Sequence, residues 1–428
     1  MNIVSRVALE RSGIALAIAE SLKMGDHLFL RMLSRRAAFG FACLFGASIA
    51  NAFKDPKVEL SKADIALIVA NPAAHGVRLA QAVQNGFNGL NSVTISDQRF
   101  AEPSFTIDGS FPGISPRSLF PFVTIGRLVN AARWRSQISL KQTSNQLNSK
   151  FYAEYLFLAQ AVRFQLALAS IRSLADTALI LSDYDRHTYC QPWIWAANFT
   201  GRRSATLVHG SPSVENYLPL LASRVFVWGE TQLKWFENLA PDAEVVVVGR
   251  PELAASTSAD SGRVPATRVV ICHSREKLSA WEVATILATI KSLQNQGLRS
   301  HLRLHPSAKS EDLDVDWSAI ASRVDSLGIG RGDFVQSLED GDVVIVVSSS
   351  AAIEASLRGI PVLVLADESR DLPCDLEAMR SHSIATLTDF DPADRLIPSE
   401  LSEQIVALVG ADSAEAIRAA VTSTVARS

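Results

Sequence analysis

Short apolar runs that alternate with amphipathic segments divide most of this chain into predicted strands and helices. Continuous β-branched runs are typical of strands buried on both faces of a parallel sheet, and apolar residues three and four apart predict helices. In the first half, the predicted strands are residues 63–70, 178–181, 205–208, 225–228 and 243–248. In the second half, they are residues 268–272, 301–304, 342–347 and 362–366.

Helical periodicity fills the spaces between these strands. The predicted helices are residues 76–83, 149–173, 280–295, 315–327, 351–358, 399–409 and 414–427. The stretch from residue 92 to about residue 121 is polar and interrupted by prolines, so we expect a loop there. Strands that alternate with helices in both halves predict an α/β protein with two doubly wound, Rossmann-like domains.

The stretch Leu253–Ala266 is rich in Ala, Ser, Thr, Gly and Asp, which is typical of a linker. We therefore predict an apolar helical extension over residues 1–60 and two Rossmann-like domains over residues 61–252 and 266–428. In sheets of this kind, ligands bind beyond the carboxyl ends of the strands. The two domains are expected to face each other across a cleft.

The composition is that of an ordinary globular protein, with 48% hydrophobic residues, 20% charged residues and a formal net charge of -3. Because there is no excess of basic residues, nucleic-acid binding is not expected. The four cysteines are far apart and form no CxxC pair, which argues against a disulfide scaffold or a zinc site and favours a reducing compartment. The chain contains no P-loop, HExxH or GxSxG motif.

One segment near the start leaves several interpretations open. Arg35 and Arg36 precede an apolar run over residues 37–53 that contains Ala50-Asn51-Ala52. Read from Met32, this is the order of a signal peptide: basic start, apolar middle and small residues for cleavage. The run is short and rich in Gly and Ala for a spanning helix, which needs ~20 apolar residues. Its apolar residues would equally suit a helix on a membrane surface or a helix packed against the rest of the protein.

The most informative stretch is DVVIVVSSSAAIE (342–354), a predicted buried strand that ends in Ser348–Ser350 before a helix begins. A helix start carries unpaired N–H groups and a partial positive charge, and so favours an anion, most often phosphate. The alternative is a plain turn whose serines cap the helix. Glu354, one turn into the helix, would accept hydrogen bonds from ribose hydroxyls, or is simply an acid favoured by the helix dipole.

Another strand end also carries polar side chains. In HLRLHP (301–306), alternation places His301, Arg303 and His305 on one face. A strand inside a covered sheet is normally apolar on both faces, so we expect these groups to lie toward the strand end, at the cleft. The alternative is an edge strand with a solvated polar face.

Two strand ends in the first half offer candidate bases. His209 follows the strand 205–208 in the turn HGSPS and would transfer protons near neutral pH. Asp183 and Asp185 follow the strand 178–181. For each, the alternative is a residue of a plain turn: a histidine bonded to a backbone carbonyl, or aspartates favoured by turn geometry.

Taken together, these segments resemble a known group of enzymes. HGSPS (209–213), VFVWGE (225–230), VVVVGRP (245–251), LRLHPS (302–307) and SSSAAIEASLRGIPVLVL (348–365) are similar in order and kind to bacterial surface-polysaccharide glycosyltransferases of the GT-B fold. The resemblance covers roughly residues 175–370. It is strongest to capsule-synthesis, sialyltransferase-like and teichoic-acid-type transferases, which bind a nucleotide-activated donor in the second domain and an acceptor in the first.

By this resemblance, His305 and Ser348–Ser350 contact the donor phosphate, and Arg303 and Glu354 belong to the same donor site. His209 corresponds to the histidine of the WHGTP segment in teichoic-acid enzymes, which is the catalytic base. In this chain Val208 replaces the Trp of that segment and Ser211 replaces its Thr.

In sialyltransferase-like members the base is instead an acid of a D/E-D/E-G motif. Asp183 and Asp185 lie in the comparable region but without the glycine. We therefore favour His209 over Asp183 or Asp185 as the base.

The function expected from this resemblance is an inverting glycosyltransferase that needs neither a metal nor another cofactor. Its partners would be a nucleotide-activated sugar and an envelope polysaccharide or lipid-linked acceptor. Nucleotide sugars are cytosolic, so the protein is expected in the cytoplasm, with residues 34–53 as a candidate peripheral contact with the inner membrane. A sugar-nucleotide 2-epimerase and a non-catalytic carbohydrate-assembly protein are the competing hypotheses.

Overall fold

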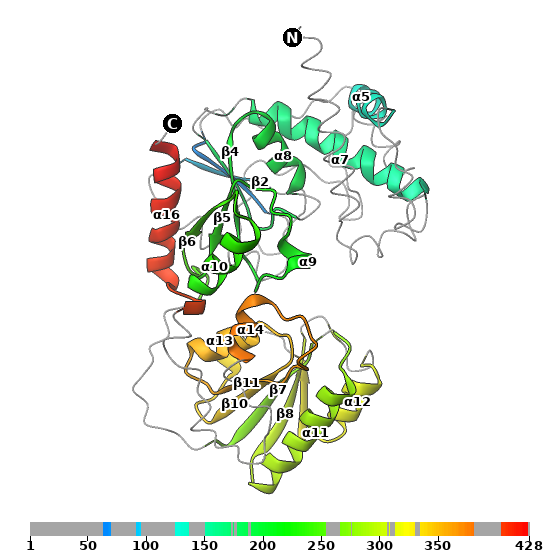
Figure 1. Ribbon diagram of the computed structural model, residues 1–428, viewed down its shortest axis with the longest axis vertical. Helices are drawn as coiled ribbons and strands as arrows, with labels where there is room; N and C mark the ends of the chain where they lie inside the picture. Colours follow the sequence, from blue (N-terminus) through cyan, green and yellow to red (C-terminus); the bar gives the residue numbers. More distant parts are fainter. Residues whose placement is uncertain are drawn as a thin grey trace.

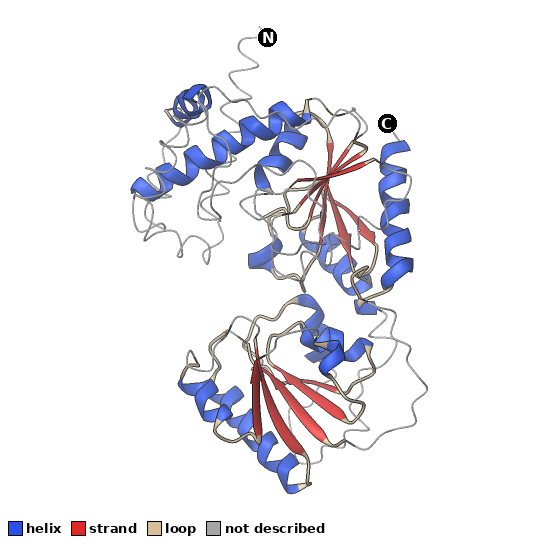
Figure 2. Ribbon diagram, turned by 180° about the vertical axis from the view of Figure 1, so that it is seen from behind, coloured by secondary structure: helices blue, strands red, loops and turns tan. Residues whose placement is uncertain are grey.

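The computed structural model describes residues 63–69, 91–95, 125–136, 150–172, 174, 178–186, 190–253, 266–274, 276–305, 308, 313–329, 334–380 and 404–426. Over these residues the protein is α/β, with two separate parallel sheets covered by helices (Figures 1 and 2). This arrangement confirms the predicted fold class. The predicted extension over residues 1–60, including residues 34–53, lies outside the described residues.

The first sheet has six parallel strands in the order β2-β1-β3-β4-β5-β6. Its strands are β1 (Ile65–Ile68), β2 (Ser92–Ile95), β3 (Leu179–Ser182), β4 (Arg203–Leu207), β5 (Arg224–Val227) and β6 (Glu244–Val247). β2 lies in the stretch that the sequence predicts to be a polar loop. It is a four-residue edge strand with two half-exposed positions, so it carries too few apolar residues to be distinguished from a loop.

Each sheet and the helices that cover it are called a unit below. The helices before the linker in the first unit are α5 (Ile125–Arg135), α7 (Lys150–Ile171), α8 (Gln191–Phe199), α9 (Val214–Tyr217) and α10 (Glu230–Leu239). α7 packs along α8, and α8 packs in turn against β3 and β4. The short helix α9 follows directly from the turn that contains His209, so it shapes one wall of the candidate site.

The second sheet has five parallel strands in the order β11-β10-β7-β8-β9. Its strands are β7 (Arg268–Cys272), β8 (Arg299–Leu304), β9 (Ser326–Ile329), β10 (Asp342–Val346) and β11 (Val362–Val364). Its helices are α11 (Ala280–Asn295), α12 (Val315–Ala321), α13 (Ala351–Leu357) and α14 (Cys374–Arg380), with a 3-10 turn η2 (Val335–Ser337). β10 is buried at every position, as its β-branched run predicts.

The predicted helix over residues 315–327 is too long. α12 ends at Ala321, and Ser326–Ile329 forms the edge strand β9 instead. Gly328 therefore lies in a strand. A Cβ at Gly328 would lie 3.0 Å from the His301 ring of the neighbouring strand, so a larger residue there would require the ring to shift by a few tenths of an ångström. Apolar residues at positions 324, 327 and 329 suit either structure, which is why periodicity alone misplaced the boundary.

The last helix belongs to the first sheet, although the sequence assigns it to the second domain. α16 (Gly410–Ala426) lies beside the first sheet in Figure 1, where Ile417 and Val421 join the core around Leu181 and Phe226. Its apolar stripe is visible in the sequence, but periodicity does not show which of two sheets a helix covers. Upstream of it, Gln404 and Ile405 are the last helical residues of the stretch predicted over residues 399–409.

The chain passes between the two units twice, and the two passages lie side by side. The N–H of Arg250 donates to the carbonyl of Leu408 at 2.8 Å, and Arg250 pairs with Val409 as a parallel bridge. Gly249 has a φ of 77° and packs against the backbone of Leu408. Only glycine fits both the backbone angle and the close approach.

The loops that follow the strands of one sheet contact those of the other. Cys374, after β11, donates its N–H to the carbonyl of Pro212, after β4, at 2.9 Å. Glu354, after β10, lies 3.7 Å from Arg250, after β6. The carboxyl ends of the two sheets therefore face each other, where ligands of α/β sheets bind.

Gly249→Ala is expected to lower the free energy of unfolding by roughly 2–4 kcal/mol, because the new Cβ meets the Leu408 backbone in a strained conformation. Gly297→Ala is the matched control, since Gly297 has a φ of 83° but open space around it, and its cost should be about 1 kcal/mol. Urea denaturation of both variants measures the difference. Equal losses would mean that the chain crossing is not tightly packed.

Candidate functional site

His209 lies at the carboxyl end of β4 and is held by its neighbours in one orientation. Its Nδ1 lies 3.0 Å from the carbonyl oxygen of Asp183, and its backbone N–H donates to the Tyr217 hydroxyl at 3.2 Å. The Tyr184 ring contacts the imidazole edge-on at 4.8 Å. A carbonyl can only accept, so the neutral ring carries its proton on Nδ1. His209 thus makes the hydrogen bond to a backbone carbonyl that a plain turn histidine would make. The same bond leaves Nε2 unprotonated, so that Nε2 could accept a proton as a base does.

Asp185 has a different role from the one considered for it. Its side chain is fully buried, and one carboxylate oxygen accepts hydrogen bonds from the N–H groups of Leu221 (2.7 Å) and Ala222 (2.9 Å). Burial raises its pKa to about 6, against the opposing effect of those two hydrogen bonds. The carboxylate fixes the loop before β5 and has no exposed surface through which to reach a substrate.

Asp183 is also unsuited to act as the base, for a related reason. It is 2% exposed, and its carboxylate lies 3.4 Å from the Cys190 sulfur. What it offers to the site is its backbone carbonyl, which orients His209. Of the three candidate bases, His209 is the half-buried one that the fold presents at the carboxyl edge of the sheet.

In the second unit, the carboxyl ends of three adjacent strands, β10, β7 and β8, bring polar residues together. Ser348–Ser350 follow β10, His273 and Ser274 follow β7, and His305 follows β8. The backbone N–H of His305 points to Nδ1 of His273 at 3.5 Å, so the neutral His273 ring carries its proton on Nε2. His305 is exposed, and its contact with a donor phosphate stays a prediction.

His273 and Ser274 were missed by the sequence analysis, although a signal was available. They directly follow a predicted strand, and the rule that selected His209 and His305 applies to them equally. His273 is 9% exposed and packs edge-on against Trp317 at 4.8 Å, which fixes its ring. Ser274 is 6% exposed, and its hydroxyl has no hydrogen-bond partner among the described residues.

The turn Ser348–Ser350, called the serine turn below, has features of both a helix cap and a candidate anion site. Ser349 does act as a cap, since its hydroxyl accepts a hydrogen bond from the N–H of Ala351 at 3.3 Å. Ser350 is the N-cap residue but makes no capping bond with its side chain. No hydrogen bond joins the hydroxyls of Ser348 or Ser350 to another described residue, and Ser348 is half-buried while Ser350 is exposed.

Arg303 does not lie toward the cleft, contrary to expectation. Its guanidinium donates to the Ser337 hydroxyl at 2.8 Å and lies 4.9 Å from the centre of the Phe334 ring, both before β10. Ser337 also contacts Arg268, the first residue of β7, so this group is at the amino end of the sheet. β8 is flanked by β7 and β9 and is therefore not an edge strand, and its polar face is half-buried.

His301 lies on the same face of β8 as Arg303. Its Nδ1 lies 2.9 Å from the Ser326 hydroxyl of the edge strand β9. Burial lowers its pKa, and the charges of Arg268 and Arg303 lower it further, so the ring is neutral at neutral pH. The polar alternation of β8 thus serves contacts within the second unit at His301 and Arg303, and only His305 reaches the carboxyl edge.

Glu354 is engaged with the first unit. Its carboxylate lies 3.7 Å from the guanidinium of Arg250, which also pairs with Glu252 at 2.8 Å and lies 4.4 Å above the Trp228 ring. Arg250 is only 5% exposed. The contact of Glu354 with a ribose stays a prediction. Its ion pair with Arg250 links α13, the helix after the serine turn, to the segment where the chain passes between the two units.

A second buried contact joins the units near His209. Asp375 is fully buried, and its carboxylate accepts a hydrogen bond from the side chain of Gln232 at 2.7 Å. Its backbone N–H donates to the hydroxyl of Ser211, two residues after His209, at 3.1 Å. Gln232 is in turn fixed by the N–H of Trp228 at 2.9 Å. Sequence reasoning missed Gln232, Arg250 and Asp375, since nothing in the local pattern marks a contact between distant segments.

Two absences concern the described part of the chain alone. No group of three His, Cys, Asp or Glu side chains there is placed to hold a metal ion. No described helix combines the length and apolar character that crossing a membrane demands.

No family model matches this chain, and no curated protein sequence matches it. Among solved structures, it is similar to an α,α-trehalose 6-phosphate synthase from Burkholderia multivorans, with 12% identity, a TM-score of 0.47, and 85% of this chain and 98% of that chain covered. A putative UDP-N-acetylglucosamine 2-epimerase from Listeria monocytogenes is 14% identical at a TM-score of 0.44, covering 86% and 94%. A chain of the GtfA/B complex is 13% identical with a TM-score of 0.41, and the similarity covers 63% of this chain and 61% of that chain. At these values the similarities assign no substrate and no residue role.

Asp375→Asn is expected to weaken the pH dependence of stability. Burial raises the pKa of Asp375 from 3.8 to about 6, so the folded protein holds a proton that the unfolded chain has released. Stability from this group is therefore fully present below pH 4 and decreases as the pH rises to 6, by on the order of 1–3 kcal/mol. The asparagine variant lacks this loss.

Urea denaturation at pH 4.5 and pH 7 tests this expectation. The decrease in unfolding free energy from pH 4.5 to pH 7 should be smaller in Asp375→Asn than in the wild type. It should stay as in the wild type in Asp340→Asn, since Asp340 is an exposed acid at the far end of the second sheet. An unchanged pH dependence in Asp375→Asn would contradict the assigned shift.

Proposed function

We propose that this protein is a glycosyltransferase that moves a sugar from a nucleotide-activated donor to a hydroxyl group of an acceptor. One observation carries the proposal: the carboxyl ends of the two parallel sheets face each other, with an oriented histidine on one and grouped histidine and serine side chains on the other. A base and an anion site on opposite walls are what glycosyl transfer from a nucleotide sugar requires.

His209 is the proposed base. The Asp183 carbonyl holds the ring proton on Nδ1, so Nε2 would accept the proton of the acceptor hydroxyl. The acceptor oxygen would then bond to the anomeric carbon of the donor, on the face opposite the leaving group, while the bond from that carbon to the phosphate oxygen breaks. This displacement inverts the configuration of the anomeric carbon and leaves the proton on His209.

The phosphate leaving group would be stabilised in the second unit. Ser348 is half-buried and Ser350 is exposed, and their hydroxyls have no hydrogen bond to another described residue. His273 carries its proton on Nε2. Hydrogen-bond donors held in place before the reaction stabilise the developing charge without reorganisation. His305 is the exposed member of this group and the one that a bound phosphate would reach from the solvent side.

An envelope polysaccharide or a lipid-linked glycan is the proposed acceptor. The support is the resemblance of five ordered segments to surface-polysaccharide transferases. Residues 34–53 remain the candidate peripheral contact with the inner membrane, on the cytoplasmic side where nucleotide sugars are made.

Nucleotide binding is the first test. Ligands that bind only the folded state raise the melting temperature, so CMP, CDP, UDP and GDP are compared by thermal shift. One of them should stabilise the wild type. Ser348→Ala/Ser350→Ala should weaken that binding about tenfold, since two hydrogen bonds to a charged group are lost. His301→Ala, outside the proposed site, should bind normally, and absence of binding by all four nucleotides would refute the proposal.

Transfer is the second test. His209→Ala should lower the rate of sugar transfer by roughly 10²–10⁴-fold while leaving nucleotide affinity unchanged, because its role is proton transfer. Product formation is followed with the nucleotide sugar selected by binding. Epimer formation without an acceptor would instead identify a sugar-nucleotide 2-epimerase. Nucleotide binding with no chemistry that depends on His209 or His305 would indicate a non-catalytic protein.

A further inference from the structure

A cavity of about 420 Å³ lies between the two units. On the first unit it is lined by Ser213 and Asn216, in the turn and helix that follow His209. On the second unit its walls come from the loops after β7 and β11. Its volume is large enough for a sugar ring, and both units contribute to it.

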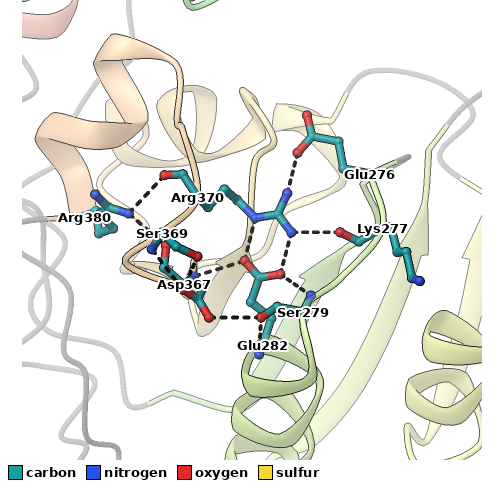
Figure 3. Close-up of polar contacts among 8 residues, drawn as sticks. All are labelled: Glu276, Lys277, Ser279, Glu282, Asp367, Ser369, Arg370 and Arg380. Atoms are coloured by element: carbon teal, nitrogen blue, oxygen red, sulfur yellow. Dashed lines mark hydrogen bonds and ion pairs between the residues drawn. The ribbon is translucent and has the colours of Figure 1, made fainter.

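Arg370 is the only positively charged residue among the described residues that line this cavity, and its charge is already balanced. Figure 3 shows its guanidinium between two carboxylates. Its Nε and Nη2 donate to Glu282 at 2.5 Å each, and its Nη1 donates to Glu276 at 2.8 Å. Nη2 also donates to the carbonyl of Lys277 at 2.8 Å. Each guanidinium nitrogen is therefore committed to the protein.

Glu282, the main partner of Arg370, is fully buried and stays charged. Burial raises its pKa, but the hydrogen bonds from Arg370 and from the N–H groups of Ser279 and Asp367 outweigh burial, so the pKa lies below its ordinary value. Breaking the Arg370–Glu282 pair to bind an incoming anion would leave this carboxylate buried without its counter-ion. Such an exchange is strongly unfavourable.

The other charged groups that line the cavity are acids. Glu276, Asp367 and Asp371 carry three negative charges against the single positive charge of Arg370, a formal balance of -2. Hydrogen bonds from the Ser369 N–H and hydroxyl lower the pKa of Asp367, so this carboxyl is ionised at neutral pH. Asp371 is exposed and has no hydrogen bond with another described residue.

We propose that this cavity takes an uncharged sugar ring and excludes sugars that carry an acidic group. Carboxylates accept hydrogen bonds from sugar hydroxyls, and Ser213, Asn216 and Ser369 can both donate and accept. A carboxylate or phosphate on the sugar would meet three like charges and find no uncommitted cation among the lining groups. Like-charge contacts of this kind reject the wrong ligand, which is how specificity is commonly obtained.

This inference rests on the proposed function, and it narrows the substrate class in a way that the sequence resemblance does not. The resemblance includes enzymes that transfer acidic groups. The acidic lining of the cavity favours the transfer of an uncharged sugar.

The test compares nucleotide sugars that differ only in charge at one position. The nucleotide that stabilises the protein selects the pair: UDP-glucose with UDP-glucuronic acid, or GDP-mannose with GDP-mannuronic acid. Calorimetric titration should give at least a tenfold weaker affinity for the acidic sugar than for its neutral partner. If CMP is the nucleotide selected, CMP-sialic acid should bind more weakly than CMP itself.

Asp371→Asn should reduce the discrimination at least threefold, since it removes one charge from the lining without breaking a hydrogen bond of the described structure. Glu368→Gln is the matched control, because Glu368 is exposed in the same loop but lines the neighbouring groove instead of the cavity. It should leave the discrimination unchanged.

The failures of the two proposals are distinguishable. Equal or tighter binding of the acidic sugar would overturn this inference and leave the glycosyltransferase proposal standing. No binding of any nucleotide would refute the proposed function, and this inference with it.

Discussion

Arg250 holds the two sheets together at the point where the chain crosses between them. Its backbone pairs with the returning segment at Leu408 and Val409, its guanidinium lies over Trp228, and its charge is shared by Glu252 and Glu354. The strands of each sheet are parallel, so the carboxyl ends gather at one edge of each sheet. Arg250 and the Asp375 contact set those two edges face to face. The arrangement of His209 opposite the serine turn depends on this connection.

The connection is polar, buried and incompletely satisfied. One nitrogen of Arg250 and one oxygen each of Glu252 and Asp375 have no hydrogen-bond partner among the described residues. Unsatisfied buried polar atoms cost free energy, whereas the ion pairs themselves are costly to break one partner at a time. A contact of this kind is specific without being strongly favourable. Interfaces of this polar kind between domains of one chain resemble transient interfaces more than permanent ones.

Each edge contributes a different chemical property. In the first unit, buried backbone geometry determines the tautomer of His209, since a carbonyl can only accept a hydrogen bond. In the second unit, the hydroxyls of Ser348 and Ser350 make no hydrogen bond to another described residue and are the proposed donors to a phosphate. Between these edges, the commitment of Arg370 to Glu276 and Glu282 makes the cavity acidic despite the arginine in its wall. The same network that fixes the loop thus underlies the proposed preference for an uncharged sugar.

Local signals in the sequence were enough to establish the α/β class, most strand positions, and His209 and His305 as strand-end residues, because β-branched runs and the polar residues that end them need no distant partner. These signals did not reveal β2 or β9, whose four residues carry little periodicity, nor the sheet that α16 covers. Arg303 was misjudged because alternation gives the face of a strand but not the direction of a long side chain. The exclusion of Asp185 and the roles of Arg250, Gln232 and Asp375 come from contacts between segments far apart in the chain. Such contacts exist only after folding, so no local pattern could have predicted them.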